Sequence, residues 1–253
     1  MCYDLQAQEE AQIRRARLHG DRYAVEEIEE RLIGMTDLPI YHASGFSHPD
    51  MLIYTDDSPY FPIVAKWGLV PHWVRDADGM KKIWNNTLNA RGETIFEKPS
   101  FRQAAKNNRC LVYVDGFYEH HHFNGKTYPF YIYRKDKNPM ILAGLFSERD
   151  EPLDGVYASF TIVTTEGNSM MAKIHNNPKA KGPRMPLILT EATAENWLDR
   201  IDDEVDKKMI QDLIKSYPEE ELTYHTVARL RGKEYAGNIE TISDEVVYDE
   251  LVF

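Results

Sequence analysis

Between residues 38 and 165 the chain contains a series of short runs rich in Val, Ile, Tyr and Phe, and this series constrains the fold more than any other feature. The runs are bounded by Gly, Pro, Asn or Asp, which is the pattern of β-strands separated by turns. Asn124-Gly125 lies between two of them and is typical of a tight hairpin turn. The predicted strands cover residues 50–55, 62–70, 110–119, 129–134, 140–146 and 158–165.

Helical patterns lie on either side of this region. Ala, Glu, Arg and Leu dominate residues 7–34, which we expect to form one or two helices that cover the rest of the fold. Pro99 precedes a shorter helical pattern, and Thr190 is a candidate cap for another. Residues 239–253 are expected to add a closing strand. The shorter helices are predicted at 99–107, 191–199 and 203–216.

The sequence of 253 residues contains no linker, internal repeat or low-complexity tract, so we predict a single α+β domain over residues 1–253. Its core should be a mostly antiparallel, barrel-like β structure flanked by helices. No apolar run reaches the roughly 18 residues that a membrane span needs, and the N-terminus has no apolar signal region. Two cysteines, Cys2 and Cys110, exclude a disulfide framework. We expect a cytoplasmic monomer that needs no metal and no cofactor.

Charge is distributed unevenly along the chain. The formal net charge of −11 argues, as an average, against binding to nucleic acid. Residues 66–135, however, carry 12 basic and 6 acidic side chains and sum to +6, while residues 1–65 sum to −7 and 191–253 to −10. Charges more than about 10 Å apart are screened at ordinary ionic strength, so a local basic patch can bind a polyanion. The basic middle is therefore either a nucleic-acid surface or a set of solvated loops.

Cys2 directly follows the initiator Met. If Met1 is removed, Cys2 carries an α-amine and a thiol on adjacent carbons, a nucleophilic pair that no internal cysteine offers. Position alone does not distinguish such a nucleophile from a chance cysteine.

The stretch "WGLVPHW" places Trp67, Pro71 and Trp73 within seven residues. Tryptophan is often buried, so this stretch is either a corner of the core or a stacking surface for bases.

In "NARGET", Asn89 and Arg91 are two residues apart, so an extended chain presents both on one face. The amide suits the orientation of a substrate, and the guanidinium suits a phosphate. The alternative is a surface turn in which Arg91 forms an ion pair with Glu93.

The strand "CLVYVDGFYEHHH" carries Glu119 near its end. Unless Gly116 carries a bulge, alternation puts Glu119 on one face with Leu111, Tyr113, Asp115 and Phe117. A carboxylate there is either at the solvent rim or desolvated, and desolvation raises a carboxyl pKa toward the range of general acid–base catalysis. The histidines at 120–122 alternate between faces and cannot all ligate one metal, so we expect exposed histidines near the hairpin turn.

His175 lies in a Pro- and Gly-rich segment that leads to Arg184-Met185-Pro186 and another apolar run. A histidine on a loop between rigid strands is a common place for proton transfer, although many loop histidines are merely exposed.

Together, the N-terminal Met-Cys, "WGLVPHW", "NARGET", "VDGFYE" and "IHNN…RMPLIL" resemble, in order and spacing, the SOS-response-associated peptidase family, also described as abasic-site processing proteins. The resemblance extends from residue 2 to about residue 189. In that family the mature N-terminal Cys attacks the aldehyde of an abasic site in single-stranded DNA and closes a thiazolidine. The resulting protein–DNA cross-link shields the lesion during the DNA damage response. The resemblance also implies self-removal of Met1.

The resemblance assigns roles to individual residues. Cys2 would be the nucleophile, Asn89 would orient it or the opened sugar, and Glu119 would shuttle protons. His175 would act as a second acid or base near the 3′ phosphate. The implied DNA contacts come from Trp67, Pro71 and Trp73 beside the lesion, from Arg91 and Arg184 on the backbone, and from Met185 and Pro186 next to Arg184.

Two departures from the family pattern stand out. The family usually follows its Cys with Gly-Arg, whereas this chain has Tyr3 and Asp4. One expected phosphate contact is therefore missing, and Asp4 is expected to repel a DNA backbone. Residues 7–34 look like a helical insertion relative to the family pattern.

Two other function classes stay open on the sequence. One is an N-terminal-nucleophile Cys hydrolase or peptidase that uses the same residues. The other is a non-catalytic module that binds single-stranded DNA, in which Cys2 is incidental. Covalent attachment to abasic DNA would distinguish an abasic-site processing protein from both of these classes.

Overall fold

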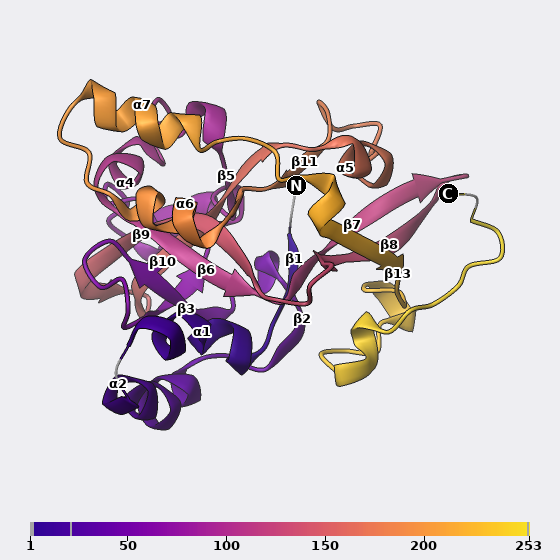
Figure 1. Cartoon of the computed structure of the whole chain (residues 1–253), viewed down its shortest axis with the longest axis horizontal. Coiled ribbons are helices and arrows are strands. Elements are labelled where there is room, and N and C mark those ends of the chain that lie inside the picture. Colours follow the sequence, from indigo (N-terminus) through magenta and orange to yellow (C-terminus); the bar gives the residue numbers. More distant parts are fainter. Residues whose placement is uncertain (1–2, 21, 252) are drawn as a thin grey trace.

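The computed structural model describes residues 3–20, 22–251 and 253, and its centre is a closed β-barrel (Figure 1). The barrel closes because one long strand, β10, pairs with β9 on one side and with β4 on the other. The β4–β10 pair is parallel, and the other pairs around the ring are antiparallel. The order around the ring is β3 (Asp50–Thr55), β4 (Ile63–Trp67), β10 (Val156–Glu166), β9 (Met140–Leu153) and β6 (Arg109–Val114).

A second, five-stranded sheet packs beside the barrel in the described part of the chain, and all of its pairs are antiparallel. The first strand of the chain lies inside this sheet, between β2 and β7, with Asp4 opposite Ser44 and Tyr118. The N-terminal segment is thus fixed by hydrogen bonds on both sides. The order of the sheet is β13 (Leu222–Thr226), β8 (Lys126–Arg134), β7 (Gly116–Phe123), β1 (Asp4–Ala7) and β2 (Ile40–Ser44).

Strands β6 and β7 are one continuous run in sequence but belong to different sheets. The side-chain alternation changes phase between them: Val114 and Phe117 share one core cluster, and Tyr113 lies in another. The predicted single face from residue 111 to 119 is therefore wrong. The chain turns at Gly116, where an added Cβ would lie 2.6 Å from the Ile132 carbonyl oxygen.

Short strands extend the barrel sheet at its edges. β5 runs parallel to β10, with Asn89 opposite Ile162, and β11 runs antiparallel to β10, with Arg184 opposite Glu166. β5 and β11 thus bring two distant segments of the sequence to one end of β10, while β12 pairs with β9, with Ile188 opposite Leu142. Their bounds are β5 (Asn89–Arg91), β11 (Arg184–Pro186) and β12 (Ile188–Leu189).

Helices cover the outer surface of the barrel (Figure 1). Thr190 caps α6 through a reciprocal pair with Thr193, which confirms the predicted helix start. The helical pattern at 7–34 begins only at Glu9, because Ala7 belongs to β1. The bounds are α1 (Glu9–His19), α2 (Arg22–Glu27), α3 (Ala77–Ile83), α4 (Arg102–Asn107), α5 (Ser169–Ile174), α6 (Glu191–Leu198) and α7 (Glu204–Asp212).

Buried polar groups fix α1 on the barrel. The Gln12 Oε1 atom accepts a hydrogen bond of 2.7 Å from the Leu52 amide, and its Nε2 atom donates to the Tyr113 carbonyl. Leu52 lies on β3 and Tyr113 lies on β6, so Gln12 links α1 to two strands of the barrel. This helix is a cover of the barrel, as the sequence predicts.

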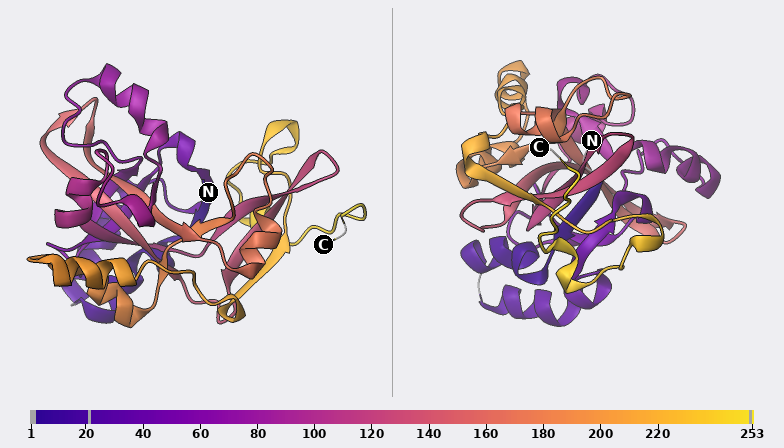
Figure 2. Two further views of the ribbon diagram at one scale, coloured as in Figure 1. Left: turned by 90° about the horizontal axis from the view of Figure 1, so that it is seen from above. Right: turned by 90° about the vertical axis from the view of Figure 1, so that its right-hand side faces the viewer.

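The C-terminal segment follows β13 and runs along the same end of the molecule as β7 and β8 (Figure 2). The strand predicted at 239–253 is absent from the described residues of this segment. They contain a 3-10 turn at Glu240–Ser243 and a single bridge between Val227 and Glu245. The prediction is wrong because the alternating apolar residues do not form one buried strand face: Tyr248 and Leu251 pack singly against the core, whereas Val247 is 77% exposed.

Two hydrophobic clusters form most of the core. One fills the barrel and the space toward the five-stranded sheet, with Trp67, Phe117 and Phe160 among its buried members. The other lies between the barrel and its covering helices, around Tyr54 and Trp197. Among the described residues, no helix is both long enough and apolar enough to cross a membrane.

Candidate functional site

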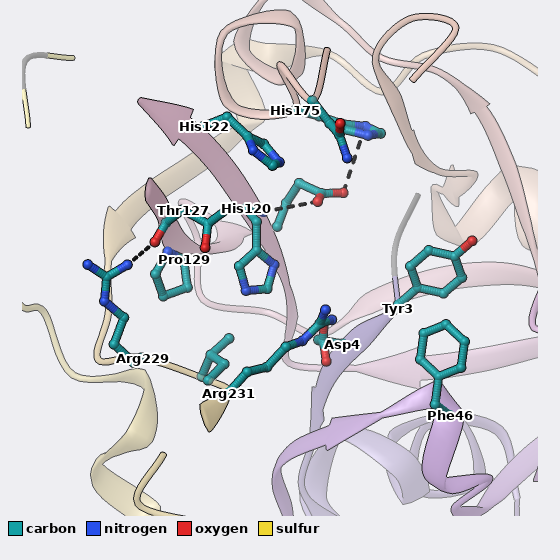
Figure 3. A pocket seen from close by; sticks show the side chains of 13 residues that line it. Tyr3, Asp4, Phe46, His120, His122, Thr127, Pro129, His175, Arg229 and Arg231 are labelled. Atoms are coloured by element: carbon teal, nitrogen blue, oxygen red, sulfur yellow. Dashed lines mark hydrogen bonds and ion pairs between the residues drawn. The ribbon is translucent and has the colours of Figure 1, made fainter. Parts of the chain in front are cut away.

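A cavity of about 370 Å³ opens where β1, the β7–β8 hairpin and the C-terminal segment meet (Figure 3). Five separate segments of the chain contribute side chains to it. Cys2 itself lies outside the described residues. The described lining residues are Tyr3, Asp4, Phe46, Glu119, His120, His122, Thr127, Pro129, His175, Asn177, Arg229, Leu230 and Arg231.

Glu119 and His175 form a buried acid–base pair in the wall of this cavity. Glu119 lies on β7, is 8% exposed, and accepts a 2.9 Å hydrogen bond from the His120 amide through Oε1. Its Oε2 atom lies 3.8 Å from Nδ1 of His175, which follows the last residue of α5. The sequence analysis identified Glu119 and His175 as separate candidates for proton transfer, and the fold brings them together.

The environment of His175 favours its neutral form. Burial lowers the pKa of this histidine, although the nearby Glu119 carboxylate acts in the opposite direction. The Arg184 amide donates a hydrogen bond of 3.0 Å to Nδ1. With Nδ1 held as an acceptor, the neutral imidazole carries its proton on Nε2, and the carboxylate beside it can accept and return a proton during a reaction.

The three consecutive histidines are divided between two faces of β7. His120 and His122 line the cavity, whereas His121 lies behind them with Nδ1 2.9 Å from the Lys173 carbonyl oxygen. The alternation was predicted, but the predicted exposure is wrong, because all three rings are at least partly buried. Burial lowers the pKa of His120. The described residues contain no group of three metal-ligating side chains.

Asp4 is the second buried carboxylate at the cavity and is held by partners on both of its oxygens. The Arg231 Nη2 atom donates to Oδ2 at 2.8 Å, and the His42 Nε2 atom lies 3.2 Å from Oδ1. Burial alone would raise the pKa of Asp4, but the hydrogen bond from His42 and the charge of Arg231 outweigh it and lower that pKa. The repulsion expected between Asp4 and a DNA backbone is offset by this pairing.

Asn89 and Arg91 lie on β5 at the end of β10, and neither is among the described residues that line the cavity. Arg91 is exposed, and Asn89 is partly buried. The ion pair considered for Arg91 is absent: Glu93 instead takes two hydrogen bonds from Arg184, at 2.7 and 2.8 Å. Arg91 therefore presents its guanidinium to solvent.

The "WGLVPHW" stretch divides between core and surface. Trp67 is fully buried and donates from Nε1 to the Leu88 carbonyl at 2.8 Å, and Pro71 is buried as well. Trp73 is 46% exposed. Of the three, only Trp73 offers a ring face for stacking.

Arg184, Met185 and Pro186 form β11 and are all buried. Arg184 is held by Glu93, and Met185 belongs to the barrel core. These side chains are packing elements in this structure, and the predicted contacts with DNA are not favoured by their burial.

Phe46 and Arg231 line the cavity but were not singled out from the sequence, and Tyr3, which also lines it, was noted only as a departure from the family pattern. The rings of Tyr3 and Phe46 lie 5.1 Å apart, and Phe46 is 48% exposed. An exposed aromatic residue in the polar turn "SGFSH" was the available signal for Phe46. Nothing local marks Arg231, because its partner Asp4 is 227 residues away in sequence.

Comparisons with known proteins give a consistent result. The family model described as "SOS response associated peptidase (SRAP)" matches residues 24–233. The abasic site processing protein YoqW of Bacillus subtilis is 34% identical over 166 residues, which make up 65% of this chain and 68% of that protein. The abasic site processing protein HMCES of Xenopus tropicalis is 31% identical over 217 residues, covering 75% of this chain and 61% of that protein.

Solved structures with the same fold include a protein from Bacteroides thetaiotaomicron, with a TM-score of 0.80 and 30% identity. That match covers 97% of this chain and all of the other. A protein from Bordetella bronchiseptica, at 21% identity and a TM-score of 0.67, shares the fold.

Proposed function

Because the chain belongs to the SOS response associated peptidase family, we propose that it processes abasic sites in single-stranded DNA through a covalent cross-link to Cys2. The observation that carries this proposal is the buried Glu119–His175 pair in the cavity beside the start of β1. The relatives are named as abasic site processing proteins, which suggests the lesion. The cavity contains the acid–base groups that a reaction at that lesion needs.

The start of β1 explains how Cys2 would reach this cavity. Tyr3 lines the cavity, and its carbonyl accepts a 2.6 Å hydrogen bond from the Gly45 amide. Asp4 is clamped between two strands directly after it. Cys2 is bonded to Tyr3, and consecutive Cα atoms are about 3.8 Å apart. The nucleophile is therefore tethered to a fixed lining residue.

The other cysteine is a poor candidate for the same reaction. Cys110 is fully buried in the barrel core, and burial raises the pKa of its thiol. It also has no free α-amine. A five-membered ring with an aldehyde needs amine and thiol on adjacent carbons, which only an N-terminal cysteine has.

The proposed reaction begins once Met1 has been removed. The Cys2 amine attacks the C1 aldehyde of the opened abasic sugar, forming a carbon–nitrogen bond and a carbinolamine. The carbinolamine loses water to give an imine. The thiol sulfur then adds to the imine carbon, and the thiol proton ends on nitrogen. One aldehyde and one aminothiol thus give one thiazolidine and one water.

Each step moves a proton, and the acid–base pair suits this task. Glu119 would assist opening of the sugar ring and protonate the departing hydroxyl of the carbinolamine. Nδ1 of the neutral His175 ring accepts from the Arg184 amide, so His175 would act through its Nε2–H donor, and the Glu119 carboxylate would accept the proton of the attacking amine. Asn89 would orient Cys2 or the opened sugar. The same groups would assist self-removal of Met1.

Exposed groups of the basic middle segment would guide the strand. Arg91 and Trp73 are the members of the predicted contact set that solvent reaches. A guanidinium suits a phosphate, and an indole face suits a base. We therefore propose contacts from these two residues, a role in the DNA damage response, and action as a cytoplasmic monomer.

A denaturing gel tests the proposal. Purified protein is mixed with a single-stranded oligonucleotide carrying one abasic site, and the slowly migrating covalent band is quantified. Wild-type protein should give the band, and Cys2→Ala should abolish it. Cys110→Ala is the matched control and should retain it.

The same gel distinguishes the other two function classes. A covalent band that survives in Cys2→Ala, or no band from protein whose mass shows a free N-terminal Cys, contradicts the proposal. Binding without a band in both proteins would indicate a non-catalytic DNA-binding module. Cleavage of peptides without a band would indicate a hydrolase.

A further inference from the structure

Arg231 lines the cavity but has no role in the proposed reaction. It lies in the segment after β13, and its side chain is 58% exposed. Its Nη2 atom donates to Asp4 at 2.8 Å. A guanidinium has five N–H donors in a fixed plane, so this contact orients the group and leaves donors for a ligand.

Arg229, the other arginine of the cavity wall, is already committed to the protein. Its Nη1 atom donates to the Thr127 carbonyl, and its guanidinium carbon lies 4.8 Å from the Tyr128 ring centroid and 5.0 Å from that of Tyr248. Glu234 lies 3.8 Å from its Nε atom. These contacts make Arg229 part of the scaffold.

The arrangement of charge makes the open side of the cavity favourable to an anion. The carboxylates of Asp4 and Glu119 are buried, with 2% and 8% of their residue surfaces exposed. The guanidinium of Arg231 is the exposed partner of its pair. A solvent-borne anion therefore meets the cation first, with the carboxylates shielded behind it.

The cavity separates this cation from the acid–base pair. In Figure 3, Arg231 and Asp4 lie on one side of the cavity, and His175 and His122 lie on the other. A ligand that contacts both Arg231 and the Glu119–His175 pair therefore carries an anionic group at some distance from its reacting carbon. A sugar phosphate in a DNA strand has this form.

We propose that Arg231, oriented by Asp4, binds a backbone phosphate adjacent to the abasic sugar and so positions the C1 aldehyde at the Glu119–His175 pair. This inference rests on the proposed function for the identity of the sugar. Asp4 acts here as a positioning residue: it fixes the plane of the guanidinium and does not itself touch the ligand.

The test uses single-stranded oligonucleotides in which a neutral methylphosphonate replaces the phosphate on the 5′ side or the 3′ side of the lesion, or neither. The lesion is a tetrahydrofuran abasic analogue, which has no aldehyde and cannot cross-link. Dissociation constants are measured for wild type and Arg231→Gln. Arg200→Gln is the matched control, because Arg200 forms an equally short exposed pair with Asp202 between α6 and α7.

In wild type, one of the two neutral replacements should weaken binding about tenfold, as expected for loss of one charge-assisted hydrogen-bonded contact. In Arg231→Gln that same replacement should have less than a twofold effect, since the phosphate has already lost its partner. Arg200→Gln should behave as wild type. The inference is overturned if that penalty persists in Arg231→Gln, or if neither replacement weakens binding to wild type.

A parallel set with natural abasic sites separates this inference from the proposed function. There, the covalent band should form more slowly in Arg231→Gln by a similar factor. Absence of any covalent band from wild type would contradict the cross-linking function, while the binding cycle with the analogue would still decide the role of Arg231.

Discussion

At the scale of single residues, the site depends on two carboxylates in different electrostatic surroundings. Asp4 has a cation and an imidazole on its oxygens and is held as a charged anchor. Glu119 has a backbone amide on one oxygen and a histidine near the other. The first arrangement suits orientation of a neighbour, and the second suits exchange of a proton.

Replacement of Glu119 should therefore affect rate more than binding. We expect Glu119→Gln to slow formation of the covalent band by about 100-fold, the usual contribution of a general acid–base group. Affinity for DNA with the tetrahydrofuran analogue should change less than twofold. Glu151→Gln, at an exposed carboxylate on β9, is the control. Equal rates in Glu119→Gln and wild type would remove Glu119 from the mechanism.

His175 should also make folding stability depend on pH. Its pKa is lower in the folded protein than the roughly 6.5 of an unfolded chain, so the unfolded state binds more protons as the solution is acidified. Its contribution to stability is present above that value and is lost as pH falls through it. His175→Asn keeps an acceptor for the Arg184 amide but does not titrate.

Urea unfolding at pH 7.5 and pH 5.5 measures this effect. Between pH 7.5 and pH 5.5, the free energy of unfolding should fall further in wild type than in His175→Asn. The difference should be at most about 1.4 kcal/mol per pH unit. His120, whose pKa burial also lowers, should contribute a remaining dependence in both proteins. Parallel losses in the two proteins would contradict the assignment to His175.

At the scale of elements, the insertion of β1 between β2 and β7 decides where the first described residues of the chain lie. A terminal segment is usually mobile unless a sheet or a docking contact holds it. Here Leu5 packs in the core, and Asp4 pairs with both neighbouring strands. The four residues of β1 thus hold Asp4, and with it Tyr3, at a defined place at the cavity.

The turn between β6 and β7 is equally specific, because it carries the chain from the barrel to the sheet that holds Glu119. A Cβ at Gly116 would lie 2.5 Å from the Tyr131 ring and 2.6 Å from the Ile132 carbonyl oxygen. Gly116→Ala should lower the free energy of unfolding by about 1–3 kcal/mol. Gly34→Ala, where a Cβ would meet nothing within 4 Å, is the control. Equal unfolding midpoints for Gly116→Ala and wild type would contradict this account.

Much of the element pattern was predictable from sequence. The strand at 50–55, the cap of α6 and the start of α7 to within one residue depend on local residues, and local patterns found them. The strand at 4–7 and the phase change at Gly116 were not found, because each depends on a partner strand far away in sequence. The closing strand predicted at 239–253 is wrong for another reason: Tyr248 and Leu251 pack against the core without forming a β-strand in the described residues.

The candidate site shows a similar division. Glu119 and His175 were identified as chemically suited residues, but their 3.8 Å approach is a property of the fold. Burial of Trp67 and Met185 was not predictable from short motifs, since a tryptophan or methionine serves a core and a binding surface equally well. The pair of Asp4 and Arg231 joins the two ends of the chain.

At the scale of the whole molecule, part of the acidic charge lies away from the cavity. The helices α2, α6 and α7 each carry a net negative charge and cover the barrel, while the cavity lies at the other end with the C-terminal segment (Figures 1 and 2). A protein with a net charge of −11 can bind a polyanion when its acidic surface lies beyond the screening distance from the site. Binding to single-stranded DNA should accordingly weaken with added salt.

The central claim is that the N-terminal cysteine, and no other residue, becomes bonded to the lesion. Its most direct measurement is mass spectrometry of the covalent product before and after digestion with trypsin and nuclease. Before digestion we expect an intact mass equal to the protein without Met1 plus the oligonucleotide minus one water. After digestion we expect the modification on the first tryptic peptide, Cys2 to Arg14, at Cys2. Attachment to a lysine, or a product that retains Met1, would contradict this claim.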